Sequence, residues 1–279
     1  MSATQQVPIP YTTASRQSEA TPTALAQVLT RFEPISLAEM QSVALLDRVD
    51  TKYIMGVSQL LAALQAVTPY YRVLCIHGER VNHYQTLYFD TGDFQLYTNH
   101  HNGIGSRYKV RERKYVGSDL SFLEVKHRTN QNRTVKSRIQ IPDLATHLNG
   151  PANDFVDRHT PFDVGVLEPK LWNDYWRITL VSKQRTERLT LDLNLSFHWD
   201  EASSALPGLV IAEVKQDRVS LDSDFIQQMR RIGLRPGGMS KYCAGVCLLY
   251  DNVKTNNFKP RLRQVEKVIQ KELSYDRVS

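Results

Sequence analysis

The sequence predicts an α+β fold, an antiparallel β-barrel with helices packed outside. Three observations support this prediction. From Tyr84 onward, short segments alternate apolar and polar residues with a period of two, which is typical of half-buried strands. The polar positions carry Arg and Lys more often than the Thr, Ser and Gln that usually coat exposed strands. Amphipathic helices are available to cover the apolar faces, which places the charged faces inside the barrel.

The N-terminal part is predicted to hold two short helices after a disordered segment. Residues 1–30 form the predicted disordered segment, because their first two thirds are rich in Ser, Thr, Gln and Pro. Ser36 and Glu39 make a capping-box pattern that predicts a helix through about Leu46. Ser58 is the expected cap of the second helix, whose leucines recur on one face.

Seven segments are predicted to be strands. They are Gln85–Asp90, Arg107–Val116, Ser121–Arg128, Thr134–Ile141, Tyr175–Val181, Arg188–Phe197 and Leu209–Gln216. Turn signals such as Gly117-Ser118-Asp119 separate the first four, which indicates an antiparallel meander.

Two more helices are predicted near the C-terminus, at Asp222–Ile232 and from about Pro260 to Leu273. The second has apolar residues at helical spacing and a charged opposite face, so we expect it to pack on the sheet exterior. No linker divides the chain. We therefore expect one domain over residues 31–250, with residues 251–279 carrying the amphipathic helix that packs on it or extends from it.

Composition sets only loose limits on function. The 279 residues have a formal net charge of +6, from 35 basic and 29 acidic residues, which favours anionic partners weakly. The three cysteines lack the companions of a zinc site and are expected to be free thiols in a reducing compartment. No apolar segment is typical of a secretory signal or approaches the ~20 residues of a membrane helix. We expect a cytoplasmic protein, with any membrane association made through a partner.

The segment Arg107–Arg113 carries the strongest functional signal. As a strand it would project Arg107, Lys109, Arg111 and Arg113 from one face, because side chains alternate along a strand. Four cations in a row repel one another unless an anion lies among them. The pattern therefore predicts a surface that holds a polyanion, for which phosphate is the usual choice in Arg-rich recognition.

Other predicted strands carry similar faces. The tripeptide Glu-Val-Lys occurs twice, at Glu124–Lys126 and Glu213–Lys215. A sheet with one face in the core and one in water would give the same alternation. Enclosed in a barrel, these faces would instead form a cationic tunnel. There Lys and Arg would neutralise phosphates, and a Glu or two would hold a hard divalent cation.

The chain resembles the VTC (vacuolar transporter chaperone) polyphosphate polymerase domain of the CYTH-like, triphosphate tunnel metalloenzyme superfamily. The matching motifs, in the family's order, are Arg48-Val-Asp-Thr-Lys52-Tyr53, Leu87-Tyr-Phe-Asp-Thr91, Arg107-Tyr-Lys-Val-Arg-Glu-Arg113, Phe122-Leu-Glu-Val-Lys126, Thr134-Val-Lys-Ser-Arg138, Tyr175-Trp-Arg177, Arg188-Leu-Thr-Leu-Asp192, Glu213-Val-Lys215 and Ser240-Lys241-Tyr242. The wider superfamily opens with Glu-x-Glu-x-Lys, whereas this chain has Arg48-x-Asp50-x-Lys52, which favours the VTC branch. The chain resembles the standalone bacterial type, without the phosphate-sensing domain and membrane helices of eukaryotic members.

The resemblance implies a function and a set of site residues. Members transfer the γ-phosphate of ATP to a growing polyphosphate chain with the help of Mn²⁺ or Mg²⁺. The implied catalytic residues are Lys52, Arg111, Arg113, Lys126, Arg177 and Lys241. The implied phosphate-binding residues are Lys109, Lys136, Arg138, Arg188, Lys215 and Ser240. The implied metal ligands are Glu213 and Glu124.

Several alternatives stay open at this point. The same tunnel could serve a triphosphate or polyphosphate hydrolase, or a non-catalytic module that binds polyphosphate or nucleotides. Nucleic acid is not expected as a partner, because stacking aromatics are not interleaved with the basic residues. For Glu213 the alternative is a salt bridge to a neighbouring Arg. We expect His100-His101 to lie in an exposed loop, and Gly237-Gly238 to let the backbone approach a phosphate or to act as a hinge.

Overall fold

The computed structural model describes residues 23–42, 49–131, 133–218 and 220–275. The helices are α1 (Thr23–Thr30), α2 (Leu37–Ser42), α3 (Val57–Val67), α4 (Gln95–His101), α5 (Pro151–His159), α6 (Asp224–Arg231), α7 (Lys241–Leu249) and α8 (Lys259–Tyr275). The strands are β1 (Glu33–Ile35), β2 (Val49–Gly56), β3 (Tyr71–Leu74), β4 (Asn82–Thr91), β5 (Arg107–Tyr115), β6 (Leu120–Arg128), β7 (Thr134–Ile141), β8 (Leu167–Ser182), β9 (Glu187–Trp199), β10 (Ala202–Leu206) and β11 (Leu209–Gln216).

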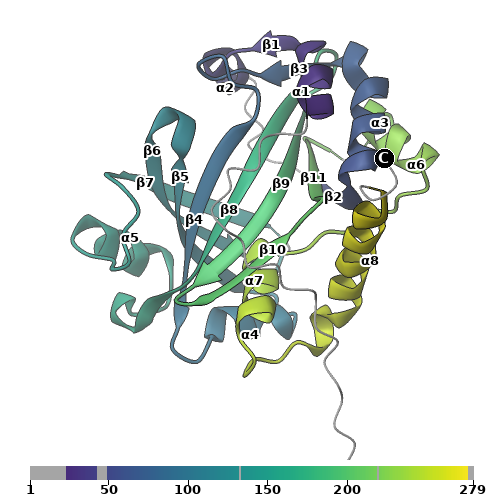
Figure 1. Cartoon of the computed structure of the whole chain (residues 1–279). Helices are drawn as coiled ribbons and strands as arrows, with labels where there is room; N and C mark the ends of the chain where they lie inside the picture. The colour runs from purple at the N-terminus through teal and green to yellow at the C-terminus, as the bar shows by residue number, and fades with distance from the viewer. Residues whose placement is uncertain (1–22, 43–48, 132, 219, 276–279) are drawn as a thin grey trace, which may run out of the picture.

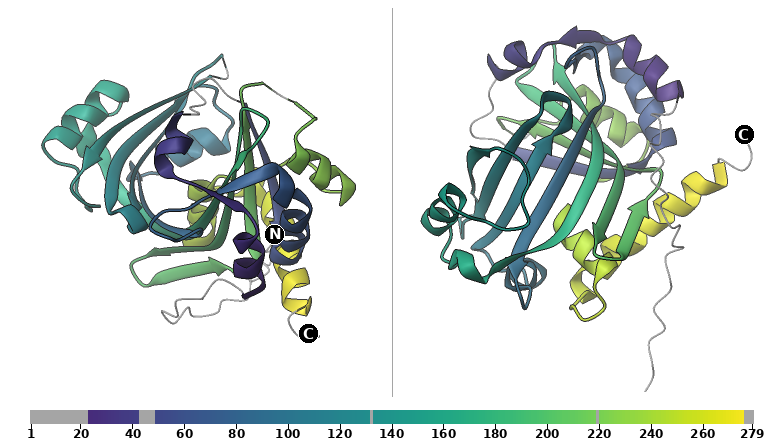
Figure 2. Two further views of the ribbon diagram at one scale, coloured as in Figure 1. Left: turned by 90° about the horizontal axis from the view of Figure 1, so that it is seen from above. Right: turned by 60° about the vertical axis from the view of Figure 1, so that its left-hand side comes forward.

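All the strands belong to one mixed sheet, in which the main path runs β2-β11-β9-β8-β4-β5-β6-β7 with antiparallel pairs throughout. The sheet curls strongly, as the two views of Figure 2 show. Its end strands β2 and β7 are not paired with each other in the described part of the chain, so the barrel is open along that seam. The α+β class, the antiparallel sheet and the external helices are confirmed. The described strands do not close the predicted barrel, because β2 and β7 share no hydrogen bonds.

The apolar faces of the strands point outward and are covered by helices. On β9, Leu189, Leu191 and Leu193 are buried in one cluster with side chains of α1, α3 and α6. Figure 1 shows α3, α6 and α8 along one side of the sheet and α5 at the opposite side. Because neighbouring residues on a strand face opposite ways, the polar residues of β9 point into the curled sheet. This arrangement is the inside-out pattern that the charged strand faces predicted.

Helix α1 corrects the expectation of disorder up to residue 30. Leu25, Val28 and Leu29 are buried against the core cluster that α3 shares, so residues 23–30 gain enough apolar contact to order. Residues 1–22 lie outside the described part of the chain. The capping box is confirmed, since the Ser36 backbone N–H donates to Glu39 Oε2 at 2.8 Å. The predicted continuation of that helix beyond Ser42 lies outside the described residues.

Two details of the predicted helices are wrong. The cap of α3 is Gly56 rather than Ser58, whose backbone N–H and hydroxyl donate to the Glu272 carboxylate at 3.0 and 2.6 Å. As a result Glu272 of α8 is buried at the start of α3, while Leu273, expected on the packed face, is 39% exposed. The helix nonetheless packs on β2 and β11, outside the sheet, as expected. Within the described ranges, no helix combines the length and apolar character needed to cross a membrane.

Candidate functional site

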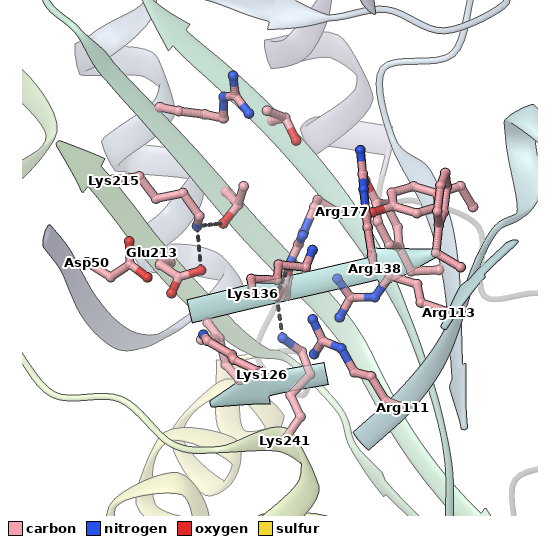
Figure 3. Close-up of a pocket in the computed structure, with 18 of the residues that line it drawn as sticks. Asp50, Arg111, Arg113, Lys126, Lys136, Arg138, Arg177, Glu213, Lys215 and Lys241 are labelled. Atoms are coloured by element: carbon pink, nitrogen blue, oxygen red, sulfur yellow. Dashed lines mark hydrogen bonds and ion pairs between the residues drawn. The ribbon is translucent and has the colours of Figure 1, made fainter. Parts of the chain in front are cut away.

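A cavity of about 430 Å³ lies inside the curled sheet. Among the described residues, eleven cationic and three acidic side chains line it. The cations are Lys52, Lys109, Arg111, Arg113, Lys126, Lys136, Arg138, Arg177, Arg188, Lys215 and Lys241. The acids are Asp50, Asp192 and Glu213. Ser240 is also in the lining, so the structure brings together all twelve residues predicted to contact phosphate. Figure 3 shows how ten of the charged residues lie around this space.

Strands β5, β6 and β7 form one continuous cationic wall. Lys109 is the register partner of Lys126, which is in turn the partner of Lys136 on β7. Directly opposed residues on neighbouring strands project from the same face, so these three ammonium groups share one side of the sheet. Arg107, one step further along β5, is not part of the cavity lining. The sequence could not say where along the strand the cavity ends.

Glu124 lies beneath this wall rather than in the lining. Its side chain is fully buried, and Arg111 Nη2 and Lys136 Nζ lie 2.7 and 2.5 Å from its oxygens. Arg113 Nη1 is 3.8 Å away. Although burial raises the pKa of Glu124, these cations hold it well below its usual range. The carboxylate is therefore a fixed counterion for three of the predicted phosphate-binding groups.

Strands β2 and β11 form the opposite wall, where charges alternate. Lys52 is opposite Glu213, and Asp50 is opposite Lys215. Lys52 Nζ is 3.1 Å from Glu213 Oε1, and Lys215 donates both to Glu213 and, at 3.0 Å, to Thr190. Burial raises the pKa of Glu213, but Lys215 and Lys52 hold it well below its usual value. Glu213 does form salt bridges, as the alternative interpretation expected, but its partners are Lys52 and Lys215 instead of an Arg.

Asp192 is a site residue that sequence reasoning missed. It accepts hydrogen bonds from Arg177 Nε and Nη2 at 2.6 and 2.8 Å, and a further one from Lys241. The Arg177 guanidinium also lies 4.9 Å from the centre of the Tyr84 ring. Because side chains alternate between the two faces of a strand, the sequence of β9 places Asp192 on the same face as Arg188. This alternation did not reveal that Asp192 would contact cations from β8 and α7.

Helix α7 begins at the cavity. Ser240 is its N-cap and accepts from Lys109 Nζ at 2.7 Å and from the Cys243 backbone N–H at 3.3 Å. The preceding Gly237 donates its N–H to the Lys52 carbonyl at 2.7 Å, and a Cβ on Gly238 would lie 2.6 Å from Lys52 Cβ. The glycine pair therefore allows close approach of this loop to β2.

The histidine pair is not in an exposed loop, which corrects that prediction. His100 and His101 end α4, and His101 is buried. His100 Nδ1 accepts from Arg107 Nε at 3.1 Å. Burial and the nearby Lys109 and Arg107 lower the pKa of His100 to about 2, so this ring is a neutral acceptor that fixes Arg107.

Three cavity lysines have strongly lowered pKa values. Burial, with Lys52 and Arg111 nearby, lowers the pKa of Lys126 to about 7. Burial lowers the pKa of Lys109 to about 8, and also that of Lys136 to about 8 although Glu124 opposes the change. Burial disfavours the charged ammonium group, and the neighbouring cations add to this effect. A bound polyanion would reverse this effect.

The carboxylates that line the cavity show how a divalent cation could be bound there. In the described parts of the chain, no group of three or more His, Cys, Asp or Glu side chains could hold a metal by itself. Glu213 and Asp50 do face the cavity from adjacent strands, side by side in Figure 3. Mg²⁺-type ions are often bound by one or two carboxylates together with substrate phosphates and water. The donor set fits such an ion when phosphate oxygens complete the coordination.

The fold and site define an α+β protein whose curled antiparallel sheet surrounds a strongly cationic, polyanion-sized cavity. The model of the VTC domain matches residues 47–250, and the chain belongs to this family, as the sequence motifs predicted. No curated protein matches the sequence.

Solved structures with a similar fold include three proposed cyclases. One is from Bacillus halodurans, with 12% identity, a TM-score of 0.46, and coverage of 70% of this chain and 94% of that one. Another, from Vibrio parahaemolyticus, has 15% identity, a TM-score of 0.43 and coverage of 70% and 94%. The third, from Hippeastrum and described as having a dominant triphosphatase activity, has 13% identity, a TM-score of 0.46 and coverage of 71% and 96%.

Proposed function

We propose that this protein is a metal-dependent polyphosphate polymerase, which transfers the γ-phosphate of ATP to a growing polyphosphate chain inside the cavity. The observation that carries the proposal is the lining itself, in which eleven cations of the described chain face three acids. No small neutral ligand would balance that charge, whereas ATP and a chain of phosphates would. Membership of the VTC domain family supports polymerase activity over other uses of the same cavity.

The cations are held in place before any substrate binds. Glu124 fixes Arg111, and Asp192 fixes Arg177 through two hydrogen bonds. Groups that are already oriented stabilise the charge on a transferring phosphoryl group without reorganisation during the reaction. In phosphoryl transfer, positioning and electrostatics supply most of the rate, so this fixed cationic frame is the catalytic apparatus.

Glu213 and Asp50 are the residues that would hold Mn²⁺ or Mg²⁺ together with phosphate oxygens. When bound, the ion would neutralise charge on the phosphates and help to align them. Lys52 and Lys215 contact Glu213 in the ligand-free protein. If Glu213 held a metal ion, these two lysines would be available to contact phosphate.

The proposed step needs no general base. A terminal phosphate oxygen of the acceptor forms a bond to the γ-phosphorus of ATP, and the bond from that phosphorus to the β–γ bridging oxygen breaks. ADP leaves with the electron pair. The attacking oxygen is already anionic, whereas attack by water would require removal of a proton. Glu213 and Asp192 have pKa values held well below their usual range, so neither carboxylate is a good base for attack by water.

Product analysis tests the proposal. Purified protein incubated with ATP and Mn²⁺, and separately with Mg²⁺, should form long acid-labile phosphate chains and ADP. A chelator should abolish their formation. Release of inorganic phosphate without chains would show that the protein is a hydrolase and not a polymerase. Binding of ATP without turnover would show that it is a non-catalytic binding module.

A further inference from the structure

Strand β2 forms one edge of the curled sheet and has a single neighbour. Among the described strands it pairs with β11 alone, and its other edge faces the open seam. Asp50 and Lys52, which line the cavity, both lie on this strand. A strand with one neighbour leaves part of its backbone unpaired within the sheet, so its position depends on contacts from outside the sheet.

Helix α8 supplies such contacts. It lies beyond residues 47–250, the part of the chain that matches the VTC domain. The helix packs on β2 and β11, and Figure 1 shows it on the side of the sheet where these two strands lie. Val265 and Ile269 of α8 are buried in the same apolar cluster as Ile54 of β2. The helix is therefore fixed against the outside of the wall that carries Asp50 and Lys52.

Glu272, near the end of α8, fills a notch formed by two glycines. Its side chain is buried, a Cβ on Gly56 would overlap its carboxylate, and a Cβ on Gly208 would lie 2.9 Å from its own Cβ. The carboxylate accepts hydrogen bonds from the backbone N–H and the hydroxyl of Ser58 at 3.0 and 2.6 Å. Gly56 ends β2, and Gly208 comes directly before β11. Glu272 thus holds one end of the β2–β11 pair.

The beginning of α8 contacts β2 through the loop that precedes α7. Gly237 of this loop donates its N–H to the Lys52 carbonyl at 2.7 Å. Arg261 of α8 lies directly over Gly237, since a Cβ there would be 2.5 Å from Arg261 Nη1. One helix therefore reaches β2 at two places, at Lys52 through the loop and at Gly56 through Glu272.

The placement of β2 decides which charged groups meet. In the observed register Lys52 is opposite Glu213 and Asp50 is opposite Lys215. A shift of β2 along β11 would separate these pairs and move Asp50 away from Glu213. The cationic wall formed by β5, β6 and β7 belongs to other strands and would stay in place.

We propose that Glu272 is a positioning residue of the site, which holds β2 on β11 so that Asp50 and Glu213 can bind a divalent ion together with phosphate oxygens. The inference rests on the proposed function for the role of the ion. It goes beyond it by giving α8 a part in forming the site. Glu272 itself lies outside the cavity lining and does not contact the bound groups.

Two measurements on the full chain test this role without relying on chain formation. Amide hydrogen exchange reports local opening of β2, with β6 as the internal reference. Calorimetry gives the dissociation constant of tripolyphosphate with and without Mn²⁺, and the ratio of the two constants is the gain from the metal. The variants are Glu272→Ala and Gly56→Ala, which empty or block the notch from opposite sides. Glu272→Gln keeps the shape of the side chain and one acceptor oxygen, and Gln270→Ala at an exposed position of α8 is the control.

In Glu272→Ala and Gly56→Ala, the amides of residues 51–55 should exchange about tenfold faster than in the wild type, while those of β6 change less than about twofold. The gain from Mn²⁺ should fall by about three- to tenfold. Metal-free tripolyphosphate binding should change less than about threefold, because the opposite wall is distant from the notch. Glu272→Gln should stay near the wild type, and Gln270→Ala should match it.

Three results would overturn the positioning role. They are unchanged exchange in β2, an equal rise of exchange in β2 and β6, which would make Glu272 a residue of general stability, and faster exchange in β2 with an unchanged gain from Mn²⁺. Failure of the proposed function looks different. A wild type that forms no phosphate chains from ATP but shows the expected exchange and Mn²⁺ gain would refute the polymerase and keep Glu272 as the positioning residue of a metal-dependent polyanion site.

Discussion

Arg111 and Glu124 lie opposite each other on β5 and β6, and the guanidinium donates two hydrogen bonds to a single buried carboxylate oxygen. The distances to Glu124 Oε2 are 2.8 Å from Nε and 2.7 Å from Nη2. Lys136 contacts the other oxygen. The repulsion among the cations on β5 is therefore reduced, because Glu124 on the next strand neutralises part of their charge.

Glu124→Gln should lower the free energy of unfolding by about 3 kcal/mol, the scale for breaking a buried ion pair on one side. The variant leaves Arg111, Arg113 and Lys136 without their shared anion. Urea denaturation measures the loss, and Glu201→Gln at an exposed position is the control. Tripolyphosphate should restore much of the stability, because it supplies the missing negative charge. Unchanged stability with a raised metal requirement would instead make Glu124 a metal ligand.

Arg138→Ala should weaken tripolyphosphate binding without lowering stability. None of the ion pairs of the described residues involves Arg138, which lies over the Phe122 ring at 4.5 Å. Its removal breaks no buried ion pair, so apart from the contact with the Phe122 ring only a contact with bound phosphate is lost. We expect a loss of about 1.5–3 kcal/mol of binding free energy by calorimetry, the range for a hydrogen bond to a charged group. Arg263→Ala on the exposed side of α8 is the control, and a lower unfolding midpoint for Arg138→Ala would assign it a structural role.

Polyanion affinity should fall as pH rises from 7 to 9. Lys126, with a pKa of about 7, and Lys109 and Lys136, with pKa values of about 8, lose their protons over this range. ATP binding without metal at pH 8 should therefore take up protons, since its terminal phosphate is already ionised. Calorimetry in buffers of different ionisation enthalpy measures the uptake. Zero uptake at pH 8 would mean that these lysines do not meet the phosphates.

The stability of the ligand-free protein should change with pH in the opposite direction. In the unfolded chain these lysines keep pKa values near 10.4, so between pH 7 and 8.5 the unfolded state binds more protons than the native state. The free energy of unfolding then rises with pH in that window. Lys126→Met should flatten the rise, as urea titrations at pH 7, 7.75 and 8.5 would show.

Strands were predictable where apolar and polar residues alternate in the sequence. The predicted segment Arg188–Phe197 corresponds to β9, along which leucines alternate with polar residues. The predicted segment Leu209–Gln216 matches the bounds of β11, although seven of its eight residues are buried. Strand β8 begins at Leu167, earlier than the predicted Tyr175, since an irregularity in register between Asp174 and Trp176 interrupts the pattern. Strand β2 was missed because Tyr53 through Gly56 are all buried and show no alternation.

The residues that line the cavity were predictable, but the ion pairs between them were not. The resemblance to the VTC domain, carried by short motifs of the sequence, selected the cations that line the cavity. Which acid neutralises which cation depends on how distant strands meet. Asp192 of β9 contacts Lys241, which is far along the chain at the start of α7, and Glu124 turns beneath the wall instead of into the cavity. Contacts of this kind come from the curvature of the sheet, which no local pattern encodes.

Glu213→Gln separates metal-assisted transfer from simple anion binding. The substitution removes a carboxylate that fits a divalent ion and releases Lys52 and Lys215, which now contact it. Metal-free tripolyphosphate binding should therefore be retained or strengthened, while Mn²⁺-dependent chain formation falls by about 100-fold or more, the scale of losing one electrostatic group at a transition state. The Mn²⁺ concentration for half-maximal activity should also rise, whereas Glu201→Gln should change neither quantity. If Glu213→Gln lowered tripolyphosphate affinity and activity equally, Glu213 would act by holding the lysines in place rather than by binding metal.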